Sequence, residues 1–195
     1  MLVVGFAAGA FRANCYLLAA GPDQGCVVVD PGQQAGAGVR KALREHGLTP
    51  EAVLATHGHP DHVGSAAELA DEYGIPVWIH PDDHDLLGAA ARELTGEVLG
   101  LAGLAIAVDH TPGHTPGSVI FRLDTPEGGR VALTGDTLFA GSVGRGDQQA
   151  IAGSVRDALL PLPDDTVVLP GHGRPTTIGR ERTSNPFLTG SAVTR

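Results

Sequence analysis

The chain has 195 residues, of which 42% are hydrophobic and 18% are charged, and its formal net charge at pH 7 is −9. This length is enough for one buried core and falls in the usual range of a single domain, while the composition is too apolar for a disordered chain. Lys41 is the only lysine, so the chain has no uniformly basic surface for phosphate backbones, and we predict no nucleic-acid partner.

The first apolar stretch, from Leu2 to Phe11, has no basic residue before it and is interrupted by Gly5 and Gly9. It therefore predicts a strand and a turn, not a signal peptide. No window approaches the ~20 apolar residues of a membrane-spanning helix, so we predict no membrane partner. Cys15 and Cys26 are too few for a disulfide framework and are expected to be buried thiols. These features together predict a cytoplasmic protein.

Short apolar runs rich in β-branched residues recur along the chain between glycines and prolines, which is typical of strands. They occupy residues 15–19, 26–29, 53–55, 77–79, 104–108, 119–123, 131–133 and 167–169. Helical spacing is clearest in a segment that ends at Gly74 and Pro76, where the predicted buried face consists of Val63, Ala66, Ala67, Ala70 and Tyr73. Weaker helical patterns cover residues 39–46 and 151–160. Strands separated by helices predict one mixed α/β sandwich domain over residues 1–195, with a loose tail after Thr189.

Four of the predicted strands end directly in a polar residue or a glycine-rich turn. In open α/β sheets, ligands gather at the carboxyl ends of the strands. We therefore expect these polar residues to converge at one edge of the fold. The four strand ends are Asp30-Pro31-Gly32, Thr56-His57, Thr134-Gly135-Asp136 and Pro170-Gly171-His172.

The segment from Thr56 to His62 contains three histidines and one aspartate between a predicted strand and a predicted helix. Histidine and aspartate at this spacing offer the nitrogen and oxygen donors that zinc accepts. From an extended turn, His57 and His59 can point the same way, while Asp61 and His62 project from the start of the helix. One short segment can thus serve two metals, and a surface histidine patch is the weaker interpretation.

Three further donors, His114, Asp136 and His172, lie in glycine-flanked turns or directly after a strand. A single carboxylate at Asp136 can bridge two ions through its two oxygens. Seven donors suffice for two sites of three protein ligands that share this carboxylate and keep a position open for water. The remaining four histidines stay outside the predicted site. His46 lies near a helix end, His80 and His84 lie in an acidic turn expected to be solvated, and His110 does not belong to the family pattern described below.

The order His-x-His-x-Asp-His, then a separate His, Asp and His, resembles the pattern of the metallo-β-lactamase-fold superfamily. Within it, the chain is similar to the short, single-domain glyoxalase II group, or hydroxyacylglutathione hydrolase-like proteins. The resemblance spans nearly the whole chain and implies a four-layer αββα sandwich with mixed sheets and metals at one edge. The segments that carry the subgroup resemblance are Asn14-Cys15-Tyr16-Leu17, Asp30-Pro31-Gly32, Gly141-Ser142-Val143-Gly144-Arg145, Pro170-Gly171-His172-Gly173, Glu181-Arg182 and Asn185-Pro186-Phe187-Leu188.

By position, the resemblance implies that one metal is held by His57, His59 and His114, that a second is held by Asp61, His62 and His172, and that Asp136 bridges them. The implied ions are two divalent metals, zinc first, with iron or manganese as alternatives. A bridging hydroxide, oriented by Asp61, would attack the carbonyl of a small-molecule thioester such as S-lactoylglutathione.

Three more residues are weaker candidates. Arg145 and Arg182 could bind a substrate carboxylate, although pairing with a surface acid is as common a role for arginine. Asp30 could brace a ligating histidine, with a plain turn role as the alternative.

Other functions stay open at this point. Persulfide dioxygenases also resemble this chain, including residues 181–186, and hold one iron with two histidines and one aspartate, here His57, His114 and Asp136. A non-catalytic metal-binding member of the fold is a further alternative, whereas a secreted β-lactamase would need an export signal. The larger glyoxalase II enzymes grip glutathione with a C-terminal helical region that has no counterpart here, so the thiol carrier is open. The stretch between Gly88 and Gly103 is short for this group and is expected to reshape the pocket.

Overall fold

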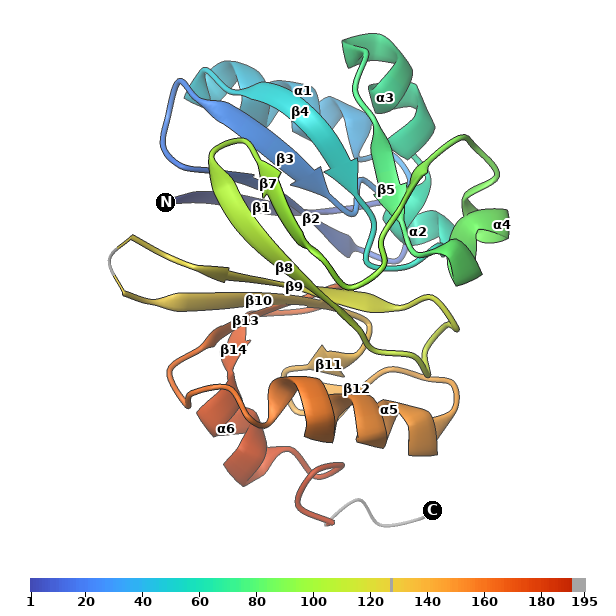
Figure 1. The fold of residues 1–195 in the computed structure, drawn as a ribbon, viewed down its shortest axis with the longest axis vertical. Coiled ribbons are helices and arrows are strands. Elements are labelled where there is room, and N and C mark those ends of the chain that lie inside the picture. The colour runs from blue at the N-terminus through green and yellow to red at the C-terminus, as the bar shows by residue number, and fades with distance from the viewer. Residues whose placement is uncertain (127, 191–195) are drawn as a thin grey trace.

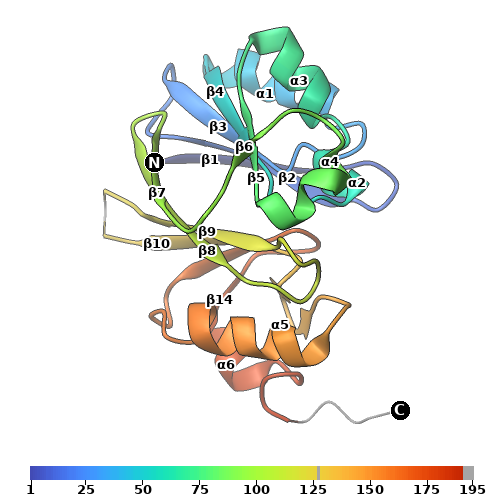
Figure 2. The same ribbon diagram turned by 45° about the vertical axis from the view of Figure 1, so that its right-hand side comes forward.

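The computed structural model describes residues 1–126 and 128–190, in which two six-stranded sheets pack face to face and helices cover the outer side of each (Figure 1). The turned view in Figure 2 shows the same succession of helices, sheet, sheet and helices. The predicted four-layer αββα sandwich is therefore confirmed. The last residues of the predicted loose tail, 191–195, lie outside the described residues.

The first sheet follows the chain order and changes from antiparallel to parallel pairing. Strands β1 to β3 pair antiparallel, whereas β3 to β6 pair parallel. The parallel strands point their carboxyl ends at the same edge, so the segments after β3, β4 and β5 come together there. The strands are β1 (Leu2–Ala8), β2 (Ala13–Ala19), β3 (Gly25–Val29), β4 (Thr49–Leu54), β5 (Val77–Ile79) and β6 (Arg92–Glu93).

The second sheet has the order β14-β13-β10-β9-β8-β7 and contains one parallel pair, β10 with β13. Because these two strands run in the same direction, the residues that follow them emerge at one edge. The strands are β7 (Val98–Leu101), β8 (Leu104–His110), β9 (Val119–Asp124), β10 (Arg130–Gly135), β13 (Val167–Pro170) and β14 (Thr176–Thr177), and a separate small hairpin consists of β11 (Leu138–Phe139) and β12 (Ser142–Val143).

Helices on the two outer faces complete the four layers. On the first sheet lie α1 (Gly36–His46) and α3 (Ala66–Tyr73), and on the second lie α5 (Gln148–Ser154), the π-helix η2 (Val155–Leu159) and α6 (Ile178–Ser184). Three short helices connect strands near the sheet edge: α2 (Pro60–Val63), the 3₁₀-helix η1 (Pro81–Asp83) and α4 (His84–Leu87). None of the helices within residues 1–126 and 128–190 combines the length and the apolar character that crossing a membrane requires.

Apolar side chains fill the space between the two sheets and the space under each helical layer. The cluster between the sheets draws on the inward faces of β2, β3, β4, β9 and β10, as expected for strands whose side chains alternate between two faces. Its fully buried members include Leu18, Val27, Leu54 and Phe121. This rigid core holds the strand ends in fixed relative positions.

Every predicted strand is present, but the clearest predicted helix is divided. It is interrupted between α2 and α3, where Ser65 donates its hydroxyl to the Gly32 carbonyl and its main-chain N–H to the Pro31 carbonyl. The prediction that Ala67 belongs to the buried face is wrong: Ala67 is exposed and Leu69 is buried instead. The break at Ser65 resets the helical phase, which a continuous 3.6-residue period misses. Strands β6, β11, β12 and β14, each of two residues, gave no periodic pattern, and β7 was missed as well.

Candidate metal centre

Seven side chains from both sheets meet at the edge where the parallel strands end. The loop after β4 and helix α2 contribute four of them, the β8–β9 connection contributes one, and the turns after β10 and β13 contribute one each. Their donor atoms form three overlapping groups, within each of which the atoms lie within 4.8 Å of one another. These groups are His57, His59 and His114; His57, His62 and Asp136; and Asp61, His62 and His172.

The first group is a set of imidazoles that face a common point. His59 Nδ1 lies 2.9 Å from His114 Nε2, and the His57 ring lies 4.9 Å and 4.7 Å from the rings of these two, nearly perpendicular to both. Three nitrogens brought this close, without a carboxylate among them, are the arrangement that one divalent ion would join.

The second metal group, Asp61, His62 and His172, lies beside the first, and the Asp136 carboxylate lies between the two. His62 Nε2 is 3.3 Å from His172 Nε2, and the Asp61 carboxylate is 3.3 Å from His172 Nε2. Asp136 extends to both groups, because its Oδ1 lies 3.4 Å from His62 Nε2 and its Oδ2 lies 3.4 Å from His114 Nε2. The structure thus brings together all seven residues predicted from the sequence, with Asp136 between the two groups.

Hydrogen bonds on the outer side of the rings decide which nitrogen faces the centre. His114 Nδ1 lies 2.8 Å from the Arg145 carbonyl oxygen, His172 Nδ1 lies 3.2 Å from the Phe11 carbonyl oxygen, and His62 Nδ1 lies 3.0 Å from the Asp30 carboxylate. Carbonyls and carboxylates only accept, so each Nδ1 carries the proton and each Nε2 presents a lone pair inward. This pattern of outer acceptors is typical of histidines that bind metals.

His57 reaches the same state through Thr56. The Thr56 hydroxyl has one proton, which it donates to the Asp30 carboxylate at 2.6 Å, so it accepts from His57 Nδ1 at 3.1 Å. The inward atoms His57 Nε2 and Asp136 Oδ1 are buried and have no hydrogen-bond partner among the described residues. Buried polar atoms are rarely left without partners. A bound cation would satisfy both, so the residues present fit a metal.

Burial and mutual proximity also shift the titration of the cluster. Burial, together with neighbouring His62 and His114, lowers the pKa of His57, and burial and His114 lower the pKa of His59. Both rings are therefore neutral near pH 7, the form that binds metals. Burial works against the charged form of His62 too, but its hydrogen bond to Asp30 and the nearby carboxylates outweigh this effect and raise its pKa. Burial raises the pKa of Asp136, against the opposing effect of His62 and other histidines.

Residues in two of the segments that carry the family resemblance, 14–17 and 181–182, hydrogen-bond to the turns that hold the metal ligands. The Tyr16 hydroxyl and the Asn14 amide both donate to the Pro170 carbonyl at 2.9 Å, and Asn14 also reaches the Gly173 carbonyl at 2.9 Å. They fix the turn that carries His172. No local sequence pattern indicates these roles, because they depend on contacts between strands β2 and β13, which belong to different sheets.

Glu181 stabilises the loop of residues 141–145, which contacts His114. Its buried carboxylate accepts from the Gly141 main-chain N–H, the Thr176 hydroxyl and the Asn185 amide. It anchors the start of the 141–145 loop, whose Arg145 carbonyl accepts from His114 Nδ1.

The three weaker candidates have different surroundings. Asp30 is buried and lies against His62, as described above. Arg145 is exposed and contacts the cluster only through its carbonyl. The guanidinium of Arg182 is engaged elsewhere, because it donates to the Leu160 and Leu162 carbonyls and pairs with Asp164. Arg182 therefore holds the loop before β13, and the structure does not bring it to the cluster.

Of the four excluded histidines, His80 and His110 meet each other at the surface, with Asp82 nearby. Their rings stack at 4.1 Å with an angle of 8° between the planes. An ion binds in the plane of an imidazole ring, and one ion cannot lie in two nearly parallel stacked planes. This group is therefore a poor metal site in the observed arrangement. The turn that follows His80 is only partly solvated, contrary to expectation, because Asp83 is fully buried.

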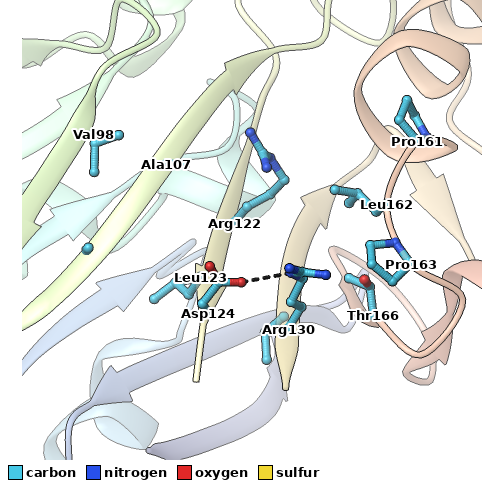
Figure 3. Close-up of a pocket in the computed structure, with 12 residues that line it drawn as sticks. Val98, Ala107, Arg122, Leu123, Asp124, Arg130, Pro161, Leu162, Pro163 and Thr166 are labelled. Carbon is cyan, nitrogen blue, oxygen red and sulfur yellow. Dashed lines mark hydrogen bonds and ion pairs between the residues drawn. The ribbon is translucent and has the colours of Figure 1, made fainter. Parts of the chain in front are cut away.

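A cavity of about 600 Å³ is separate from this cluster. It lies at the start of β10 and the end of β9, which is the opposite edge of the second sheet (Figure 3). Its two arginines are already paired, Arg122 with Asp109 and Arg130 with Asp124. The cavity is therefore distinct from the predicted metal site and shares none of its residues.

Residues 8–172 match the family model described as the metallo-beta-lactamase superfamily. The chain is 35% identical to hydroxyacylglutathione hydrolase GloC of Haemophilus influenzae (strain ATCC 51907 / DSM 11121 / KW20 / Rd), over 92% of this chain and 94% of that protein. Among solved structures, it resembles the BLEG-1 B3 metallo-beta-lactamase with 35% identity and a TM-score of 0.88, over 97% of this chain and 100% of that one. It also resembles TTHA1623 in a di-iron-bound form, with 36% identity and a TM-score of 0.80, over 95% of this chain and 100% of that one.

Proposed function

This chain belongs to the metallo-β-lactamase superfamily, and we propose that it is a binuclear metal-dependent hydrolase that cleaves a small-molecule thioester. The observation that carries the proposal is the inward set of lone pairs: seven donors at one edge, with His57 Nε2 and Asp136 Oδ1 buried and unpartnered among the described residues. The similarity to a hydroxyacylglutathione hydrolase favours an acyl thioester as substrate.

In the proposed centre, His57, His59 and His114 would hold one ion, Asp61, His62 and His172 would hold the other, and Asp136, whose two oxygens face both groups, would be shared between them. Zinc is our first expectation for both ions, since the donors are nitrogen and oxygen atoms of the kind it accepts. Two such ions, when bound, lower the pKa of water and polarise a substrate carbonyl.

The chain's own residues then orient the attacking water and carry its proton to the leaving thiolate. Asp61 is partly exposed, with its Oδ2 3.3 Å from His172 Nε2 and 3.8 Å from His62 Nε2, so it can orient an attacking water and accept its proton. The water oxygen forms a bond to the thioester carbon, the C–S bond breaks with its electron pair on sulfur, and the proton passes to the leaving thiolate. His57, which is buried, and His59, which is partly exposed, are both neutral and would hold the ion that polarises the carbonyl. No serine or cysteine nucleophile is needed.

The test combines metal content with turnover. Protein purified without added metal is analysed for zinc, iron and manganese, and thiol release is followed with S-lactoylglutathione and with other acyl thioesters. Nitrocefin is included because one similar structure is a B3 metallo-beta-lactamase. Two ions per chain with thiol release support the proposal. Metal-loaded protein that releases no thiol from any thioester refutes it, and nitrocefin cleavage would redirect it to lactam substrates.

A second candidate is an iron-dependent persulfide dioxygenase that uses His57, His114 and Asp136. The observation in its favour concerns the type of metal: a 36% identical protein has been solved in a di-iron-bound form, so a closely similar fold binds iron, there as two ions and not one. One iron per chain with oxygen uptake on a persulfide would establish this activity. Against it, all seven donors are present, including Asp61, His62 and His172, which a single iron would not use.

A further inference from the structure

Asp83, the last residue of η1, is fully buried and accepts hydrogen bonds from three donors. Its Oδ2 accepts from the Gly58 main-chain N–H at 2.8 Å and from the Thr115 hydroxyl at 2.7 Å, and its Oδ1 accepts from the Gly117 main-chain N–H at 2.8 Å. A buried carboxylate in which both oxygens are used by donors is held firmly in one position.

The three donors belong to the two loops that carry the first metal group. Gly58 separates His57 from His59, and Thr115 directly follows His114. Asp83 itself belongs to neither loop, since it lies on the segment after β5. One carboxylate therefore ties together the main chain on both sides of the group. A main-chain hydrogen bond from the Val119 N–H to the Thr56 carbonyl also joins the two loops. It lies before His57 on one loop and after His114 on the other, so it does not fix the residues next to these ligands as Asp83 does.

Gly58 and Gly117 allow Asp83 to lie directly against the two loops. A Cβ on Gly117 would lie 2.7 Å from the Asp83 carboxyl carbon, and a Cβ on Gly58 would lie 2.9 Å from the Asp83 carbonyl oxygen. Real Cβ atoms essentially never come this close to other atoms. The loops are thus shaped to receive Asp83, in addition to being hydrogen-bonded to it.

We propose that Asp83 is a positioning residue for the first metal group: its carboxylate fixes the loop of His57 and His59 against the turn of His114 so that their inward nitrogens meet. Asp83 is not one of the seven donors of the cluster. The inference rests on the proposed function only in requiring that this group binds a metal, and it holds for any reaction. The second group is braced differently, through Asp30 and His62, so the effect of Asp83 is selective for the first ion.

The sharpest perturbation is Asp83→Asn, which keeps the size of the side chain but replaces one acceptor oxygen with an NH₂ donor. Because all three partners are donors, at least one N–H or O–H of the loops then faces another donor in a buried site. Residues that orient metal ligands typically change metal affinity by about 10–100-fold when they are mutated. Asp85→Asn is the matched control, since Asp85 is exposed on the same short segment.

The experiment titrates Zn²⁺ into metal-free full-length protein against a competing chromophoric chelator, without substrate. For Asp83→Asn we expect one of the two ions to bind at least about tenfold more weakly, with the other ion and the Asp85→Asn control within threefold of the wild type. A folded Asp83→Asn protein, with a far-UV circular dichroism spectrum like that of the wild type, that binds both ions with wild-type affinity overturns the positioning role. Thioester turnover does not enter this result, so the proposed function succeeds or fails separately.

Should Asp83→Asn fail to fold, Thr115→Val decides the question. It removes one of the three donors, leaves the carboxylate in place and keeps the volume of residue 115. Weaker binding of one ion, by about threefold or more, supports the positioning role. Wild-type affinity for both ions in a folded Thr115→Val protein overturns it.

Discussion

Replacing Asp30 with asparagine should weaken metal binding most at the group of Asp61, His62 and His172, because Asp30 contacts His62 directly and reaches His57 of the first group only through the Thr56 hydroxyl. The Asp30 carboxylate accepts from the Thr56 main-chain N–H at 2.7 Å, the Thr56 hydroxyl at 2.6 Å and His62 Nδ1 at 3.0 Å. Asp30 also has a left-handed backbone, with φ of 51°, which asparagine tolerates about as well as aspartate. The substitution therefore tests the carboxylate and not the backbone.

The expected effect follows from the donors that meet Asp30. In Asp30→Asn the amide oxygen can serve the Thr56 main chain, and the NH₂ group then faces His62 Nδ1. To avoid two opposed donors, His62 must move its proton to Nε2, which removes the lone pair that faces His172. We expect the second ion to bind about 10–100-fold more weakly. Loss of at least one charge-assisted hydrogen bond should lower the free energy of unfolding of the metal-free protein by about 2–3 kcal/mol.

The assays are zinc competition titration, urea unfolding of metal-free protein, and ¹⁵N-resolved NMR of the imidazoles, which distinguishes the two tautomers. Asp71→Asn, an exposed position on α3, is the control. If His62 keeps its proton on Nδ1 in Asp30→Asn and both ions bind as in the wild type, the tautomer reasoning is refuted.

Three further outcomes are expected. Gly171→Ala should reduce metal binding at least about tenfold, because a Cβ there would lie 2.7 Å from His62 Cε1 and still closer to the Asp136 carboxylate; Gly100→Ala, where a Cβ meets nothing within 4 Å and the backbone φ is not positive, is the control. Neither thiol should react with Ellman's reagent in native protein at pH 8, since burial raises the pKa of Cys26 to about 12 and raises that of Cys15 well above its ordinary value, while urea should expose two reactive thiols per chain; rapid labelling without urea would contradict this. Removing metal with EDTA should lower Tm and added Zn²⁺ should restore it, because an ion that binds only the folded state stabilises it, and a Tm that does not respond would argue against a bound metal.

The sequence was sufficient for the chemistry of the site and for much of the fold. His57, His59, Asp61 and His62 stand in one short segment, so their clustering did not depend on any distant contact. The strands could be predicted equally well, because buried β-branched runs between glycines and prolines have few alternative structures. The helical pattern predicted over residues 39–46 also ends where α1 ends, because Gly47 closes the helix with a positive φ of 65°.

What the sequence left undetermined depends on contacts between segments far apart in the chain. Arg182 has the right chemistry for a substrate carboxylate, yet the packing of α6 directs it to the Leu160 and Leu162 carbonyls. Asp83 has the sequence context of a solvated turn, and only the approach of the Gly58 and Gly117 loops buries it among three donors. A local pattern specifies the type of a donor and the strand it follows, whereas its protonation, orientation and partners are set by whichever segment the fold brings against it.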